Sequence, residues 1–144
     1  MKYGIYYAYW EKEWNGDYKY YIDKISKLGF DILEISCGAF SDYYTKDQEL
    51  IDIGKYAKEK GVTLTAGYGP HFNESLSSSE PNTQKQAISF WKETLRKLKL
   101  MDIHIVGGAL YGYWPVDYSK PFDKKRDLEN SIKNMKIISQ YAEE

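Results

Sequence analysis

The chain has 144 residues, 42% of them hydrophobic, which is enough for one domain with a sizeable core. Twenty basic and 21 acidic residues leave a formal net charge of −1 without a basic stripe, which argues against nucleic acid as a partner. No apolar run approaches the roughly 18 residues that span a bilayer, and no charged leader precedes one, so we expect a cytoplasmic protein without a membrane partner. Cys37 is the single cysteine, which excludes an intrachain disulfide.

Four short segments are predicted to be strands, and a helical pattern follows each of them. The strands are predicted over residues 2–7, 32–35, 63–67 and 103–107. Alternation of strand and helix is typical of a parallel sheet covered by helices. The sequence therefore predicts an α/β fold made of four βα units.

The helices are predicted from apolar residues that recur three and four positions apart and so form one stripe. They run over about residues 17–29, 47–61, from after residue 82 to about 101, and from about 123 onward. We expect each stripe to be buried against the sheet. The stripes are Tyr18, Tyr21, Ile22, Ile25 and Leu28; Leu50, Ile53, Gly54 and Ala57; Ala87, Trp91, Leu95 and Leu98; and Leu128, Ile132, Met135, Ile138 and Ala142.

The connections differ in length on the two sides of the predicted sheet. Helix-to-strand connections are a few residues long, whereas strand-to-helix connections cover residues 8–16, 36–46, 68–82 and 108–122. Compact domains rarely keep such long loops without a use, so function is expected at the carboxyl ends of the strands. This asymmetry favours one half of a (β/α)8 barrel, a single (βα)4 domain over residues 1–144. An open doubly wound sheet is the alternative, but it would need a switch-point ligand site.

Fifteen Tyr and four Trp residues are unusual in a chain of this length, and most lie at strand ends and in the long loops. Rings with polar tips suit the apolar faces and hydroxyls of a sugar. Filling a wide barrel mouth or an interface is an equally good explanation for any one ring. Glycines among the rings at residues 4–10 and 107–115 would let a ligand approach the backbone, but neither stretch is a phosphate-binding motif.

Three stretches carry a resemblance to a known family. They are residues 1–22, which contain Gly4-Ile5-Tyr6-Tyr7-Ala8-Tyr9-Trp10, residues 28–35, and Gly107-Gly108-Ala109-Leu110-Tyr111 with Trp114-Pro115. They resemble the ketose 3-epimerases, the D-tagatose and D-psicose (allulose) 3-epimerase group. Members of this group are TIM (β/α)8 barrels of about twice this length. They use a divalent metal, commonly Mn²⁺ or Co²⁺, to epimerise ketohexoses such as fructose and psicose at C3.

The resemblance implies that this chain corresponds to the amino-terminal half and supplies part of the sugar pocket. The family's metal ligands, two Glu, one Asp and one His, come from the fifth to eighth strands, and the two Glu residues are also its acid/base pair. The resemblance therefore implies no catalytic residue, metal ligand or cofactor within this chain. The residues that it places around the non-reacting end of the sugar are Tyr6, Trp14, Tyr68, Ala109, Leu110 and Trp114.

The chemistry of the reaction also indicates that this chain lacks the catalytic groups. Inverting a carbon next to a carbonyl requires one base on each face and stabilisation of the enediolate. Glu34 is the only carboxylate expected near a strand's carboxyl end; we expect it to be a hydrogen-bonded interior residue, with a supporting role near the pocket as the alternative. His71 could approach Glu34, but two ligands are too few for a catalytic metal. The isolated chain is therefore predicted to be inactive.

A half barrel would leave two sheet edges and a row of inward side chains uncovered. We therefore expect either a homodimer that forms a pseudo-barrel or a complementing carboxy-terminal half. Three functions remain open: the sugar-binding half of an epimerase, a self-associating module with weak sugar binding through Trp14 and Trp114, and an engineered or fragmentary half barrel without activity.

Overall fold

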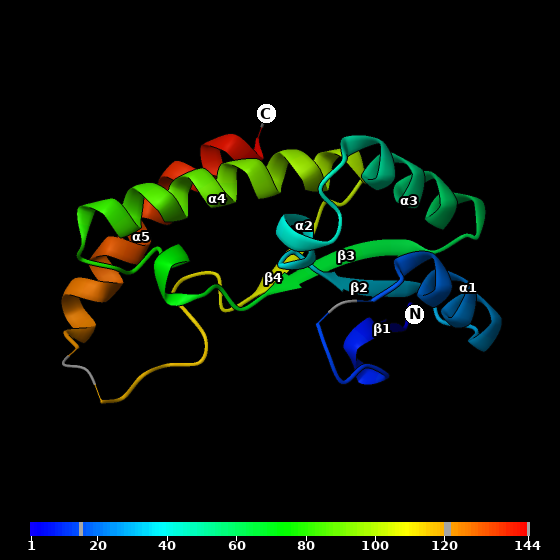
Figure 1. Cartoon of the computed structure of the whole chain (residues 1–144), viewed down its shortest axis with the longest axis horizontal. Helices are drawn as coiled ribbons and strands as arrows, with labels where there is room; N and C mark the ends of the chain where they lie inside the picture. Colours follow the sequence, from blue (N-terminus) through cyan, green and yellow to red (C-terminus); the bar gives the residue numbers. More distant parts are fainter. Residues whose placement is uncertain (15, 120–121, 144) are drawn as a thin grey trace. The chain divides into compact units, whose positions relative to one another are not determined.

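The computed structural model describes residues 1–14, 16–119 and 122–143 (Figure 1). Strands β1 (Gly4–Tyr6), β2 (Ile32–Ser36), β3 (Thr63–Tyr68) and β4 (Val106–Gly108) form one sheet in the order β1-β2-β3-β4. Helices α1 (Tyr18–Leu28), α3 (Asp47–Glu59), α4 (Pro81–Leu100) and α5 (Lys124–Ala142) each follow one strand. The predicted α/β order of four parallel βα units is therefore confirmed.

The strand-to-helix connections contain short helices that the periodicity did not predict. They are η1 (Tyr7–Tyr9), α2 (Ala39–Asp42) and η2 (Phe72–Glu74). None is long enough to form an apolar stripe, which is the signal on which the prediction depended. Residues 15, 120 and 121 of the predicted loops lie outside the described part of the chain.

The described residues form two compact units. The first unit contains residues 1–67 and 96–106, and the second contains residues 68–95 and 107–143. The first unit holds β1, β2, most of β3, α1, α3 and the last turn of α4, whereas the second holds most of α4 and all of α5. That residues 1–144 form a single domain stays a prediction.

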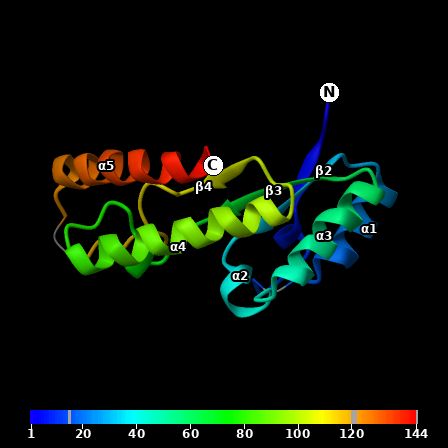
Figure 2. The ribbon, with the colours of Figure 1, turned by 90° about the horizontal axis from the view of Figure 1, so that it is seen from above.

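The two faces of the sheet in the first unit differ in polarity. Side chains alternate between the faces of a strand, so Leu33 and Ile35 share one face, and both are fully buried. Helix α1 packs on β2 and on α3, which runs alongside it (Figure 2). The opposite face, called the inner face below, is largely polar. It consists of Gly4, Tyr6, Ile32, Glu34, Ser36, Thr63, Thr65 and Gly67.

The predicted start of the first helix is confirmed at Asp17. Its carboxylate accepts hydrogen bonds from the backbone N–H groups of Lys19 and Tyr20 at 3.0 and 3.2 Å, and so caps α1. Gly29 ends the helix with a φ of 81°, a left-handed conformation that favours glycine. Leu28 is exposed, contrary to prediction, because it lies at the edge of the stripe and in the last turn.

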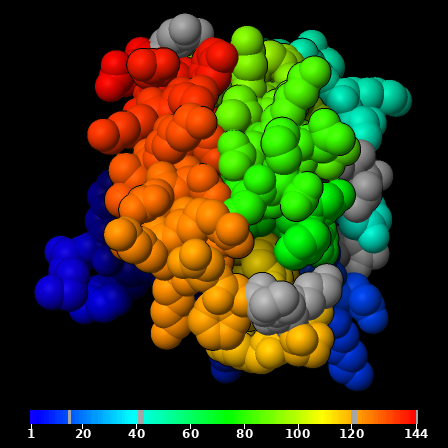
Figure 3. Space-filling model, turned by 90° about the vertical axis from the view of Figure 1, so that its left-hand side faces the viewer, coloured from blue at the N-terminus to red at the C-terminus, as the bar shows by residue number. Residues whose placement is uncertain are grey.

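The predicted apolar stripe of α5 is wrong for most of its length. Leu128 and Ile132 are 60% and 48% exposed, Ala142 is also exposed, and Ile138 is buried. The buried side instead carries Ser131 and Asn134, which donate hydrogen bonds to loop carbonyls. Buried backbone acceptors require donors, so polar side chains face the loops. Figure 3 shows α5 in orange and red beside the green α4.

Candidate functional site at the carboxyl ends of the strands

Tyr6 and Trp14 form the aromatic part of the site in the first unit. Tyr6 is the last residue of β1 and lies half-buried on the inner face. Its ring centroid is 6.3 Å from that of Trp14, with the two planes tilted by 40°. Trp14 is 67% exposed, and its carbonyl oxygen accepts a 2.6 Å hydrogen bond from the Tyr7 hydroxyl. The backbone of Trp14 is thus anchored, while the residue remains largely exposed to solvent.

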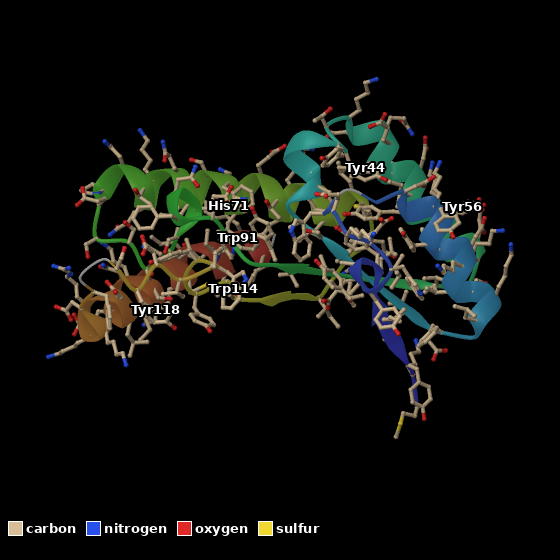
Figure 4. The ribbon with its side chains drawn as sticks, turned by 60° about the horizontal axis from the view of Figure 1, so that its bottom comes forward. Tyr44, Tyr56, His71, Trp91, Trp114 and Tyr118 are labelled. Carbon is tan, nitrogen blue, oxygen red and sulfur yellow. The ribbon has the colours of Figure 1, made fainter. Side chains whose placement is uncertain are left out.

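A buried tyrosine supports the carboxyl end of β2. The Tyr18 hydroxyl donates a hydrogen bond to the carbonyl oxygen of Ser36 at 3.1 Å and accepts one from the Ser36 N–H at 3.3 Å. The ring of Tyr44, labelled in Figure 4, stacks on Tyr18 with centroids 4.7 Å apart. Burial raises the pKa of Tyr18 far above its ordinary value, so its hydroxyl stays protonated and remains a donor. This bond pair fixes the point where β2 becomes a loop.

Glu34 is half-buried on the inner face, in register with Tyr6 of β1. Its Oε1 lies 2.8 Å from the position that a Cβ would occupy on Gly67. Burial raises the pKa of Tyr6; a hydrogen bond with the Ser36 side chain opposes this, and the charge of Glu34 adds to it. Among residues 1–14, 16–119 and 122–143, no side chain donates a hydrogen bond to Glu34, and its expected role as a hydrogen-bonded interior residue stays a prediction.

Tyr68 lies in the second unit as the last residue of β3. Its hydroxyl donates a 2.7 Å hydrogen bond to Oε2 of Glu74, and the same oxygen accepts the backbone N–H of His71 at 2.9 Å. Its ring centroid lies 5.3 Å from that of Phe90 and 6.1 Å from that of the buried Trp91. Two rings of α4 and one carboxylate therefore fix its orientation (Figure 4, where His71 and Trp91 are labelled).

The loop after β4 is joined to the loop after β3 by backbone hydrogen bonds. The N–H of Ala109 donates to the carbonyl oxygen of Tyr68 at 3.0 Å, and that of Trp114 donates to Pro70 at 2.8 Å. The Cβ of Trp114 lies 3.0 Å from where a Cβ on Gly69 would be, so a small residue is required there. Trp114 is nevertheless 64% exposed, and Figure 4 shows its ring. Leu110, which follows Ala109 in the same loop, is half-buried.

The structure places the candidate residues in two groups; Glu34 lies within β2, and the others lie at the end of a strand or in the loop that follows it. The first unit brings together Tyr6, Trp14 and Glu34, whereas the second brings Tyr68 and Trp114 close through Gly69 and Pro70. Sequence reasoning missed Ser36 and Glu74. Ser36 lies two residues after Glu34, so strand periodicity could have placed it on the same face. Glu74 gave no signal, because its six-residue separation from Tyr68 matches no regular element.

The described residues do not fit a divalent metal ion. In residues 1–14, 16–119 and 122–143, no group of three or more His, Cys, Asp or Glu side chains could hold one. His104 instead lies 2.9 Å from the carboxylate of Asp102, with both side chains exposed. Burial raises the pKa of Cys37 to about 12, so its thiol stays protonated at neutral pH and its role is packing.

Comparison with known proteins decides the family. Residues 22–144 match the family model described as a xylose isomerase-like TIM barrel. The chain belongs to this xylose isomerase-like family. Over all 144 residues it is 56% identical to the D-psicose 3-epimerase of Enterocloster bolteae, of which it covers 48%. It thus spans about half the length of the curated relatives that it matches.

Solved structures agree with this assignment. A D-psicose 3-epimerase from Clostridium cellulolyticum, solved with D-tagatose, matches with a TM-score of 0.95 and 48% identity over 99% of this chain and 49% of its own. A D-psicose 3-epimerase solved in the presence of D-fructose gives 0.94 and 43%, over 99% and 49%. The predicted resemblance and the half-barrel fold are therefore confirmed.

Proposed function

We propose that this chain forms the sugar-binding half of a ketose 3-epimerase that interconverts ketohexoses such as fructose and psicose. The proposal is supported by the positions of four aromatic side chains. Tyr6 and Tyr68 are the last residues of β1 and β3, and the exposed Trp14 and Trp114 lie in the loops that follow β1 and β4. Such rings stack on the apolar face of a sugar and bind its hydroxyls. Ala109 and Leu110 complete the contacts with the non-reacting end of the ketohexose.

The reaction itself needs groups beyond these. Epimerisation at C3 removes a proton from one face of the carbon and returns one to the other, which calls for two positioned acid/base groups. Glu34 lies next to Tyr6 on the inner face, and a single carboxylate cannot serve both faces of the carbon. In this proposal the acid/base pair and the Mn²⁺ or Co²⁺ ligands belong to another segment, and the chain alone binds sugar without turnover.

Tryptophan fluorescence provides the test of sugar binding. Titration with D-psicose, D-fructose and D-tagatose should change the emission of the exposed Trp14 and Trp114, and each Trp→Phe variant should lose part of the change. Trp10→Phe is the matched control, because Trp10 is half-buried and its ring stacks on Tyr21, which is not a proposed sugar-binding residue. A flat signal at high sugar concentration would exclude the proposal. Epimerase activity should also appear on mixing with a chain that carries the complementary later strands.

Self-association is the alternative function, and specific surfaces favour it. In the sheet order, β1 and β4 each have one strand neighbour among the described residues, and Ile105 beside β4 is 65% exposed. Unpaired edges and exposed apolar side chains favour association. The proposed partner is a second copy, or a complementing carboxy-terminal half. Size-exclusion chromatography with light scattering should show a dimer, and a well-folded monomer would contradict it.

Neither nucleic acid nor a membrane belongs to the proposed partners. Within the described residues, no helix has the length and apolar character needed to cross a bilayer. The cytoplasmic location stays a prediction from the sequence.

A further inference from the structure

The carboxylate of Glu34 is directed toward the carboxyl end of the sheet. In the strand register, Glu34 pairs with Thr65, whereas Gly67 pairs with Ser36. Oε1 nevertheless lies 2.8 Å from the Cβ position of Gly67, two residues farther along β3. Two residues of a strand span about 6–7 Å, so the side chain leans along the strand toward the site. Gly67 provides the space, because any larger residue would displace this carboxylate.

Among the residues that the structure describes, this carboxylate has no side-chain donor of the kind that a half-buried charge requires. An ionised carboxylate only accepts hydrogen bonds, and leaving it without donors is costly. In the described part of the chain, no side chain donates to Glu34 and no Lys, Arg or His forms an ion pair with it. Its acceptor oxygens are therefore available to a ligand, beside Tyr6 in the same unit.

We propose that Glu34 is a specificity-determining residue that accepts hydrogen bonds from two neighbouring hydroxyls at the non-reacting end of the sugar. It thereby rejects sugars that are phosphorylated at that end. This inference rests on the proposed function. Hydroxyl-to-carboxylate hydrogen bonds are short and charge-assisted, and the two oxygens of one carboxylate match a pair of adjacent hydroxyls. A phosphate in the same place would face a like charge without a compensating cation.

The first experiment compares Glu34→Gln with Glu59→Gln, using D-psicose, D-fructose and D-fructose 6-phosphate as probes. Glu59 is exposed at the end of α3, so its variant makes the same chemical change away from the inner face. Glu34→Gln should weaken binding of D-psicose and D-fructose at least about tenfold, whereas Glu59→Gln should not. Glu34→Gln should also reduce the ratio of the affinities for D-fructose and D-fructose 6-phosphate by at least about tenfold.

Two further measurements do not require Glu34 to be replaced. Gly67→Ala should displace the carboxylate while keeping its charge, and so weaken D-psicose binding in a chain whose circular dichroism is unchanged. In the wild-type chain, the carboxyl carbon resonance of Glu34 should shift on addition of D-psicose. The loss of that resonance in Glu34→Gln provides its assignment.

The outcomes separate the two proposals. If the wild-type chain binds no ketose, the proposed function fails and the role of Glu34 fails with it. If the wild-type chain binds but Glu34→Gln behaves like Glu59→Gln, or the Glu34 resonance does not move, only the role of Glu34 is overturned. Weakening of D-fructose and its 6-phosphate by the same factor would overturn the rejection of phosphorylated sugars.

Discussion

Gly54 of α3 packs directly against the backbone of Met101, whose carbonyl oxygen lies 2.7 Å from the position of a Cβ at residue 54. The carbonyl carbon and Cα of Met101 are each 2.9 Å from the same position. A glycine inside a helix is unfavourable by about 1 kcal/mol relative to alanine. The close approach of α3 to the segment after α4 explains why glycine is needed here.

Gly54→Ala should therefore destabilise the chain. Overpacking costs about 1–3 kcal/mol, and the clash is with backbone that cannot rotate away, so we expect a net loss of about 1–2 kcal/mol despite the better helix propensity of alanine. Urea unfolding gives the free energy. Gly107→Ala is the matched control, since a Cβ there has no neighbour within 4 Å. Equal stability of the two variants would contradict the packing described here.

Replacing Asn134 should loosen α5. Asn134 is 1% exposed, and its Nδ2 donates a 2.8 Å hydrogen bond to the carbonyl oxygen of Leu76. Asn134→Ala leaves that buried acceptor unpaired, which should cost about 1–3 kcal/mol in the free energy of unfolding. Ser139→Ala, at an exposed position of the same helix, serves as the control and should change it by less than about 0.5 kcal/mol. A neutral Asn134→Ala would show that the loop carbonyl finds another donor.

The exposed apolar side chains of α5 should contribute little to folding. Leu128→Gln and Ile132→Gln should each change the free energy of unfolding by less than about 0.5 kcal/mol, because these side chains are already largely in water. Ile138→Ala, at a buried position of the same helix, should cost about 2–4 kcal/mol. Thermal melts under conditions where the chain is monomeric provide the comparison. A large loss from Leu128→Gln would mean that this face is covered.

Alkaline pH should destabilise the fold through its buried tyrosines. Burial, followed by the hydrogen bond and charge of Glu11, raises the pKa of Tyr21 from 10.0 to about 12. The folded state therefore holds its proton more tightly, so the contribution of Tyr21 is complete below pH 10 and is lost as the pH rises toward 12. Tyr21→Phe should show a shallower decline in urea unfolding, and an identical decline would contradict this account.

The order of elements was predictable because each follows from local patterns. Asp17 and Asp123 cap helices, Gly29 ends one, and the strands occur where expected, with shifted ends. β4 starts at Val106, three residues later than predicted, after Asp102 takes a left-handed φ of 60°. The facing of α5 was not predictable, because periodicity detects an apolar stripe without revealing which surface the loop carbonyls require.

The sequence could place the candidate residues along the chain, but it could not predict their contacts. The rule that function follows strand carboxyl ends located Tyr6, Tyr68 and Trp114, and the resemblance selected them among many rings. The partners of these residues depend on distances across the fold, such as the hydrogen bond from Tyr68 to Glu74. Likewise, the closeness of Glu34 to Gly67 needs two strands in register, which one sequence does not show.

The side-chain amides and hydroxyl on the buried side of α5 hold this helix in one position against the loops. Ser131 donates to the carbonyl oxygen of Tyr111, Asn134 to that of Leu76, and Asn130 to those of Ser77 and Ser78. A helix attached by an apolar stripe can slide or rotate slightly at little cost, whereas a helix that is hydrogen-bonded to four loop carbonyls loses those bonds together when it moves. Helix α5 thereby fixes the positions of the loops that follow β3 and β4. Residues on its exposed side can be replaced without moving these loops.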